Sequence, residues 1–395
     1  MVTNNLDTLI EKYLNDIIEI RRDIHQYPEI GMEEVRTSAL VKAQLEKLGL
    51  EVQDKIGKMG VVGLLRGKKP GKTILLRADM DCLPMDELTD LPFKSKVPGM
   101  MHACGHDVHT AILLGAAKVL SELKDEIKGN IKFVFQPAEE ANPTGGARYM
   151  IEDGVLENPK VDAAVALHVW NLPLGKVGIR TSTMMAQSDR IFITVKGKSS
   201  HASQPHNGVD AIVTAGHIIT ALQTVISRNV DPMESAVVTI GTIHGGSRYN
   251  VTCDKVVLEG TVRTFNPEIS AIMPTRIKAI AENVAMALGA ECDVEYVEGY
   301  SATVNDEELA TKFIGYFKDA IGEQNVVIPS QPASGGEDFS EFTKLVPSVF
   351  YWLGMESEMN KGKTTVHNPN LVVDEGCIPV GIKTLVSGAI DFLNE

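Results

Sequence analysis

The sequence predicts an α/β fold in which a larger domain with a mainly parallel sheet is interrupted by a smaller, ferredoxin-like split βαβ domain. Short apolar runs alternate with helical patterns between residues 61 and 169, which is typical of a parallel sheet. From about residue 187 the order becomes strand, helix, strand, strand, helix, strand, which is the split βαβ arrangement. The first pattern resumes after residue 298, so the smaller domain is expected to be an insertion.

The larger domain is expected to begin with two helices. Residues 6–24 place apolar side chains at helical spacing, and Tyr27-Pro28 should end that helix because proline disfavours helical backbone at the residue before it. Residues 33–48 predict a second helix, which Gly49 should end. The strands expected next are 61–65, 74–77, 131–135 and 163–169, and the helices are 107–123, with Asp107 as N-cap, and 146–152.

The predicted insertion and the resumed domain follow in order. The strands expected in the insertion are 190–196, 236–243, 256–265 and 292–297, and its helices are 208–228 and 268–288. The resumed domain should contain a helix at 308–321, a strand at 348–353 and a last helix from about residue 379. We therefore expect one discontinuous domain of residues 1–186 and 299–395, and an inserted domain of residues 187–298.

Composition and charge exclude several classes of function. A chain of 395 residues suggests roughly two to three domains. The net charge of −14 argues against nucleic acid as a partner, since an acidic surface repels phosphates. We find no signal peptide and no apolar run long enough for a bilayer, so no membrane partner is expected. Five scattered cysteines suggest reduced thiols in a cytoplasmic protein.

Five residues of metal-binding type occur in local contexts that suit ligation. They are Cys104 and His106 in His-Ala-Cys-Gly-His-Asp, Glu140 after Gln-Pro-Ala-Glu, His168 within an apolar strand, and His367 in a loop. Each alone could be an ordinary buried cysteine, core histidine or surface residue. Together they suit zinc or a similar divalent ion, and five are too many for one catalytic zinc, which keeps three protein ligands. The set therefore suggests a hydrolase with two metals.

A second carboxylate, Glu139, precedes Glu140 and could act as a base. Acidic pairs usually lie on solvated loops, but this pair follows a buried strand. Chemistry in parallel α/β sheets lies beyond the carboxyl ends of the strands. One carboxylate would then bind metal while the other moves a proton.

The combined motifs resemble the di-metal aminoacylase and carboxypeptidase family, and within it the N-acyl-amino-acid amidohydrolases. That branch includes hippurate hydrolases, N-acetyldiaminopimelate deacetylases and auxin-conjugate hydrolases. The resemblance covers essentially the whole chain. The matching segments are Arg22–Glu29, Arg77–Asp81, Met101–Asp107, Phe135–Glu140, Ser200–Ser203, Gly260–Thr264, Gly335–Phe339 and His367–Pro369.

The resemblance implies a role for each matching residue. Cys104, His106, Glu140, His168 and His367 would bind two divalent metal ions, which could be Zn²⁺, Mn²⁺, Co²⁺ or Ni²⁺. Glu139 would be the general base and then the acid. His201 would stabilise the oxyanion in a neighbouring subunit of a homodimer or higher homo-oligomer, while Asn250 and Arg263 would lie near the substrate carboxylate. The inserted domain would act as a lid or dimerisation domain on the catalytic metal-binding domain.

Two positions depart from the family pattern. The wider family has His-x-Asp at the end of an early strand, where Arg77-Ala78-Asp79 stands here, so Arg77 cannot be a ligand. The family often has a proline shortly after the asparagine, where this chain has Val251-Thr252-Cys253. The second departure affects the loop that would carry the substrate contacts.

The expected reaction is hydrolysis of the amide bond of an N-acyl amino acid, a small molecule, to a carboxylic acid and a free amino acid. A metallo-dipeptidase or carboxypeptidase would use the same residues on a peptide bond. A non-catalytic metal- or ligand-binding relative is a third alternative, from another class. The intact Glu139 and the full ligand set argue against that third alternative.

Overall fold

The computed structural model describes residues 6–395 and divides into two compact units. Unit 1 comprises the chain up to Met184 together with Thr303–Gln331 and Asp338–Glu395. Unit 2 comprises Met185–Ala302 and Pro332–Glu337. Unit 1 contains a large, mainly parallel sheet and unit 2 a separate antiparallel sheet, which confirms the predicted fold class.

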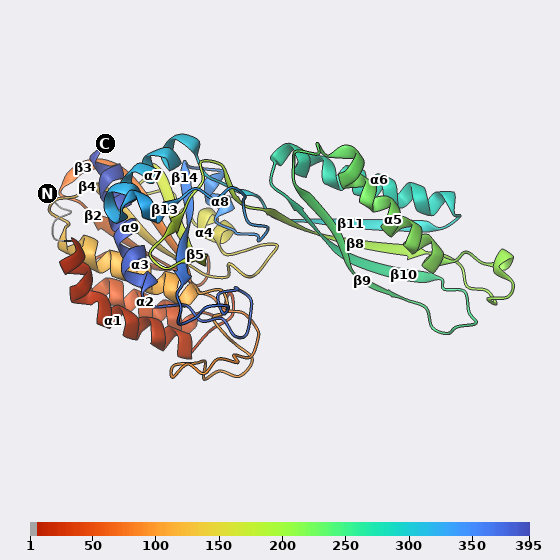
Figure 1. The fold of residues 1–395 in the computed structure, drawn as a ribbon, viewed down its shortest axis with the longest axis horizontal. Coiled ribbons are helices and arrows are strands. Elements are labelled where there is room, and N and C mark those ends of the chain that lie inside the picture. Colours follow the sequence, from red (N-terminus) through yellow and green to blue (C-terminus); the bar gives the residue numbers. More distant parts are fainter. Residues whose placement is uncertain (1–5) are drawn as a thin grey trace. The chain divides into compact units, whose positions relative to one another are not determined.

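The described part of unit 1 is built on a sheet in the order β1-β2-β4-β3-β5-β14-β6-β13. Several of its strands are labelled in Figure 1. The central strands β4, β3, β5 and β14 run parallel, so their carboxyl ends meet at one edge. β1 and β2 add antiparallel pairs beside β4. The strands are β1 Glu51–Ile56, β2 Gly60–Arg66, β3 Lys69–Asp79, β4 Lys128–Gln136, β5 Ala163–Pro173, β6 Val177–Gly178, β13 Val326–Val327 and β14 Ser348–Glu356. A small separate pair is formed by β7 Thr183–Met185 and β12 Thr303–Val304.

Helices pack against this sheet through apolar stripes. α1 buries Leu6, Ile10, Ile17 and Ile24 and packs against α3 and α9. α3 is buried along most of its length because it also contacts β3 and β5. The helices are α1 Leu6–Gln26, α2 Val35–Lys47, α3 His106–Glu122, α4 Ala147–Glu152, α7 Glu307–Ile321, the short 3₁₀ segment η3 Glu323–Asn325, α8 Ser340–Thr343 and α9 Cys377–Asn394.

The last helix, α9, is apolar enough to resemble a membrane span. Its 18 residues have a mean hydropathy of 1.2, and 67% of them are buried. It packs against α3 and α7 and contacts β3 and β14. The packing within unit 1 accounts for its composition.

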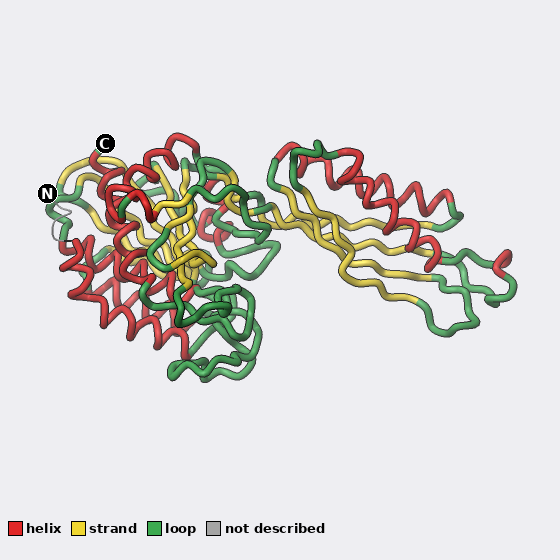
Figure 2. The backbone as a smooth tube through the Cα atoms, viewed as in Figure 1, coloured by secondary structure: helices red, strands yellow, loops and turns green. Residues whose placement is uncertain are grey.

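Unit 2 has a four-stranded antiparallel sheet in the order β11-β8-β10-β9. Two long helices, α5 and α6, lie along one face of this sheet (Figure 2). β9 forms one edge. The elements are β8 Gln187–Lys196, the 3₁₀ turn η2 Pro205–Asn207, α5 Ala211–Asn229, β9 Ala236–Gly245, β10 Lys255–Thr264, α6 Pro267–Ala287 and β11 Glu291–Tyr300.

One strand was not predicted and one local prediction is wrong. β1 was not expected, since its side chains are mostly exposed and show no clear apolar alternation. α3 begins at His106 rather than after Asp107, and Gly105, with φ +83°, occupies the N-cap position. Asp107 is fully buried and bonds the Nδ1 atom of His25 at 2.8 Å, so it pairs with α1 instead of capping α3.

Candidate active site and metal centre

The five residues predicted as ligands come from four segments of unit 1. Cys104 lies just before α3 and His106 is its first residue. Glu140 follows β4, His168 lies in β5, and His367 lies in the loop between β14 and α9. Cys104, His106 and His168 are buried, whereas the His367 side chain is 51% exposed. The candidate ligands therefore range from buried to half-exposed.

Their ligand atoms are close together. Sγ of Cys104 lies 3.3 Å from Nε2 of His168, and Nε2 of His367 lies 3.0 Å from Oε1 of Glu140. The donor atoms of Cys104, His106 and His168 lie within 4.8 Å of one another, as do those of Cys104, Glu140 and His367. Cys104 belongs to both groups. Two overlapping donor sets of this kind suit two ions that share a ligand.

Hydrogen bonds orient the two buried imidazoles. Nδ1 of His168 donates to the carbonyl oxygen of Val169 at 2.7 Å. Nδ1 of His106 lies 3.0 Å from the carbonyl oxygen of Asp81 and 3.1 Å from its carboxylate. These contacts leave both Nε2 atoms as lone-pair donors, the arrangement common in metal-binding histidines. Nε2 of His106 is buried and has no hydrogen-bond partner among the described residues.

Electrostatics at the site favour a cation. Burial raises the pKa of the Cys104 thiol well above its ordinary value, and the carboxylates of Glu140 and Glu139 raise it further. Burial also holds the pKa of His168 well below its ordinary value, which keeps the ring neutral, as a ligand must be. Divalent ions would offset the repulsion among these closely spaced acidic groups. The thiol, imidazole and carboxylate set therefore fits a metal centre.

Glu139 lies beside the candidate ligands. Its side chain is nearly buried, and its Oε2 atom lies 3.9 Å from Nε2 of His106. The donor atoms of Glu139, Glu140 and His106 lie within 4.8 Å of one another. A carboxylate at this distance could exchange a proton with a molecule bound at the centre.

A buried network of ion pairs and hydrogen bonds lies next to the candidate ligands. Arg77 donates from Nη1 to Asp79 at 2.7 Å and from Nη2 to Asp338 at 2.8 Å. Asp79 also accepts from Nδ1 of His109 at 2.6 Å, and Nε2 of His109 accepts from the backbone N–H of Val169 at 2.8 Å. Arg77 therefore supports this network as a buried cation and is no ligand. The network fixes the ends of β3 and β5.

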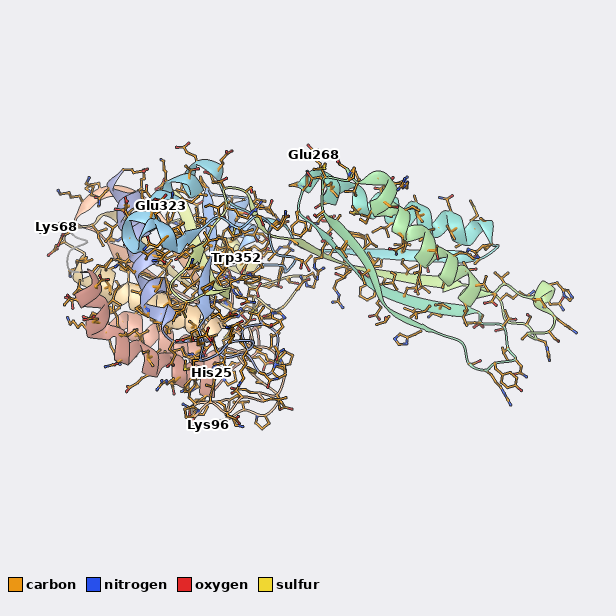
Figure 3. All side chains as sticks on the ribbon, in the orientation of Figure 1. His25, Lys68, Lys96, Glu268, Glu323 and Trp352 are labelled. Carbon is orange, nitrogen blue, oxygen red and sulfur yellow. The ribbon has the colours of Figure 1, made fainter. Side chains whose placement is uncertain are left out.

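Two tryptophan rings pack beside the candidate ligand His168. Trp170 lies two residues beyond His168, and its ring meets the His168 ring edge-on with centroids 5.6 Å apart. Trp352, labelled in Figure 3, stacks on Trp170.

The other predicted site residues lie in unit 2. His201 and Asn250 are neighbours, because the N–H of Ala202 donates to the Asn250 carbonyl at 3.1 Å and His201 forms a bridge with Val251. Arg263 lies near the other end of β10, opposite Ser188, and Lys255 begins the strand opposite Lys196. The eight residue steps from Lys255 to Arg263 span roughly 27 Å of strand. Within one subunit, Asn250 and Arg263 are therefore at opposite ends of β10.

Residues 75–390 of the sequence match the model of a protein family that is described as Peptidase family M20/M25/M40. This range contains all five candidate ligands, all of unit 2 and most of unit 1. The chain belongs to this family.

The names of the similar proteins describe hydrolytic activities. The chain is 43% identical to the N-acetyl-L-cysteine deacetylase of Bacillus subtilis (strain 168), over 95% of this chain and 86% of that protein. It is 38% identical to thermostable carboxypeptidase 1 of Saccharolobus solfataricus, over 98% of this chain and all of that protein. The structure of the Bacillus subtilis YXEP protein, described as a dinuclear metal binding peptidase from the M20 family, is similar with a TM-score of 0.83, 34% identity, and 97% and 99% of the two chains covered. The resemblance and the prediction of a metal-binding amidohydrolase are confirmed.

Sequence reasoning missed one part of this M20 site. Glu34, which precedes α2, is fully buried and accepts a hydrogen bond from the backbone N–H of Ala138, next to Glu139. A glutamate that follows another glutamate just before a helix gives no sign of burial. His109 also supports the centre, since it contacts Asp79 and Val169.

Proposed function

We propose that this protein hydrolyses the amide bond of small N-acyl amino acids, releasing a carboxylic acid and a free amino acid. The observation that carries the proposal is Glu139, held beside two overlapping sets of metal-donor atoms. The similarity to a protein named N-acetyl-L-cysteine deacetylase supports the acyl amino acid as substrate class.

The proposed chemistry assigns each step to residues of the chain. Bound divalent ions would lower the pKa of a water molecule and polarise the amide carbonyl. Glu139 takes the proton of the attacking water and later gives it to the leaving nitrogen. His201 of a second subunit hydrogen-bonds the developing oxyanion, an interaction that is strongest in the transition state.

We propose two divalent ions per chain, held by Cys104, His106, Glu140, His168 and His367. The mixture of thiolate, imidazole and carboxylate donors would accept Zn²⁺, Mn²⁺, Co²⁺ or Ni²⁺. The cysteines in the described chain, all five of those in the sequence, are free, which supports a reducing, cytoplasmic location.

We propose that the active form is a homodimer joined through unit 2. β9 is an edge strand, and an edge presents unpaired backbone groups to a second copy. Four apolar side chains on β9 and the adjacent α5 are 44–52% exposed: Ile212, Val213, Val237 and Ile243. A matching edge from a second copy would cover them.

A dimer would also explain the separation of the predicted substrate contacts. Asn250 and His201 lie at one end of β10 and Arg263 near the other. One small substrate could contact both Asn250 and Arg263 only if the two residues came from different subunits. We therefore propose that each site takes His201 and Asn250 from one subunit and Arg263 from the other.

A carboxypeptidase or dipeptidase activity is the second candidate, supported by the similarity to the archaeal carboxypeptidase. The non-catalytic alternative is dropped, because the chain belongs to a family of hydrolases and retains Glu139.

The test is a panel of N-acetyl amino acids, N-benzoyl amino acids and dipeptides, each assayed with Zn²⁺, Mn²⁺, Co²⁺ and Ni²⁺. Turnover of N-acyl amino acids at a kcat/KM well above that of dipeptides supports the proposal. Preference for dipeptides would replace it with the second candidate.

A further inference from the structure

Glu34 makes an unusual contact with the loop that carries Glu139. The Glu34 side chain is fully buried, and its Oε1 atom accepts the backbone N–H of Ala138 at 2.7 Å. Ala138 is the residue immediately before Glu139, is itself fully buried, and has φ +54°. A non-glycine residue with positive φ needs support from its surroundings. The Glu34 carboxyl supplies one such support.

The start of α2 explains why Glu34 is available for this contact. Glu34 occupies the N-cap position, yet its side chain makes no capping hydrogen bond. Glu29 accepts the N–H groups of Arg36 and Thr37 instead, at 2.9 and 2.8 Å. Because Glu29 satisfies the first turn of α2, the Glu34 side chain can extend to Ala138.

The other side of Glu139 is held in the same way. The carboxylate of Asp81 accepts the N–H of Glu140 at 2.9 Å. The turn before α2 lies directly against this loop, since a Cβ atom at Gly31 would lie 3.0 Å from Cα of Ala138. Two carboxyl groups from separate segments therefore fix the N–H groups on either side of Glu139.

We propose that Glu34 is a positioning residue for Glu139, and that it acts by holding the Ala138 peptide in its left-handed conformation. The inference rests on the proposed role of Glu139 as the proton carrier. Among the described residues, the Glu34 side chain bonds the backbone N–H of Ala138 and no hydrogen bond to a candidate ligand is found. Its effect would be on the orientation of the Glu139 carboxylate.

The contact needs an acceptor oxygen and no charge. Burial raises the pKa of Glu34 to about 8, and the nearby Asp81 charge contributes to the rise. A neutral carboxyl accepts an N–H as a neutral amide does. Glutamine should therefore replace Glu34, whereas alanine or leucine should not.

The test compares Glu34→Ala, Glu34→Leu and Glu34→Gln, with Glu33→Ala as the matched control at an exposed neighbouring glutamate. At saturating metal we expect kcat to fall about 10- to 100-fold in the alanine and leucine variants, with KM nearly unchanged. Glu34→Gln should retain most of kcat, and the control should match the parent. If the alanine variant fails to fold, Glu34→Leu still tests the contact, because leucine fills the buried space that the Glu34 side chain occupies.

Amide hydrogen exchange of the segment 136–141 provides a readout that does not depend on activity. Exchange should accelerate in Glu34→Leu and stay slow in Glu34→Gln. A glutamine variant as impaired as the leucine variant, or a leucine variant with full kcat, would overturn the proposal. Full kcat in Glu139→Gln would instead remove the proposed function of Glu139, whatever the exchange of this segment.

Discussion

Trp170 and Trp352 stack on each other, with ring centroids 5.0 Å apart and planes 10° from parallel. They are the only two tryptophans in the sequence. Trp170 also meets the ring of His168 edge-on. All tryptophan emission of this protein therefore originates beside a candidate metal ligand.

Metal binding should change this emission. Adding Co²⁺ or Ni²⁺ to metal-free protein should quench the fluorescence, since either ion would bind His168 next to the Trp170 ring. Trp170→Phe should lose most of the response, while Trp352→Phe should keep it. A titration of emission against added metal measures the effect, and an unchanged response in His168→Ala would contradict the assignment of His168.

Replacing Glu139 by glutamine should preserve the metals and abolish most turnover. Glutamine keeps the shape of the side chain but cannot accept the proton, so kcat should fall about 10²- to 10⁴-fold. Metal analysis and steady-state kinetics on the same preparation measure both properties. Glu140→Gln is the matched comparison, and it should lose metal as well as rate.

Replacing Cys104 by alanine should lower the metal content from two ions per chain. Cys104 belongs to two of the overlapping donor groups, so its loss affects both. Cys292→Ala, a partly buried cysteine in unit 2, should keep both ions. A content near one ion in the parent, unchanged in Cys104→Ala, would rule out the two-metal centre.

Chelation should destabilise the folded protein. An ion that binds only the native state stabilises it by about 2.7 kcal/mol when present at 100 times its Kd. Treatment with a chelator should therefore lower the Tm of the parent, and Tm should recover when metal is restored. The same treatment should shift the Tm of a variant lacking both Cys104 and Glu140 far less.

Two inactive variants should restore activity to each other. Glu139→Gln and His201→Ala are each expected to be inactive, but a mixed dimer contains one site with an intact Glu139 and an intact partner His201. Subunit exchange followed by assay should recover a sizeable share of activity. No recovery after proven exchange would mean that His201 acts within its own chain or has no catalytic role.

The dimer should depend on the edge of unit 2. Ile212→Lys with Ile243→Lys places charges on the exposed apolar face of α5 and β9, and should convert the dimer to a monomer with little activity. Met286→Lys, at an exposed position on α6, is the control and should leave the mass in solution unchanged. Light scattering measures the outcome, and a dimer that persists in the double variant would place the interface elsewhere.

Much of the architecture could be predicted because the chain marks it locally. The apolar run around Phe133 predicts a buried strand, and the order of elements after residue 187 predicts the split βαβ unit. Cys104, His106 and Glu140 could be selected because unusual residue types occur in compact motifs at strand and helix ends. His168 and His367 are persuasive only together with the other three, because a lone histidine in a strand or a loop is usually an ordinary core or surface residue.

The remaining features depend on contacts between distant residues. β1 carries mostly exposed side chains and forms because β2 offers a free edge. Asp107 looks like a helix cap until His25 on α1 is brought beside it. Glu34 shows no local sign of burial, since its partner is a backbone N–H about a hundred residues further along the chain.

The last candidate ligand, His367, lies beyond β14, close to the end of the chain. Ribosomes synthesise a chain from its N-terminus at about 5–20 residues per second. The candidate ligands Cys104, His106, Glu140 and His168 are therefore made well before His367. All of unit 2 is made in that interval. A nascent chain therefore cannot assemble the full set of five candidate ligands until residue His367 has been synthesised.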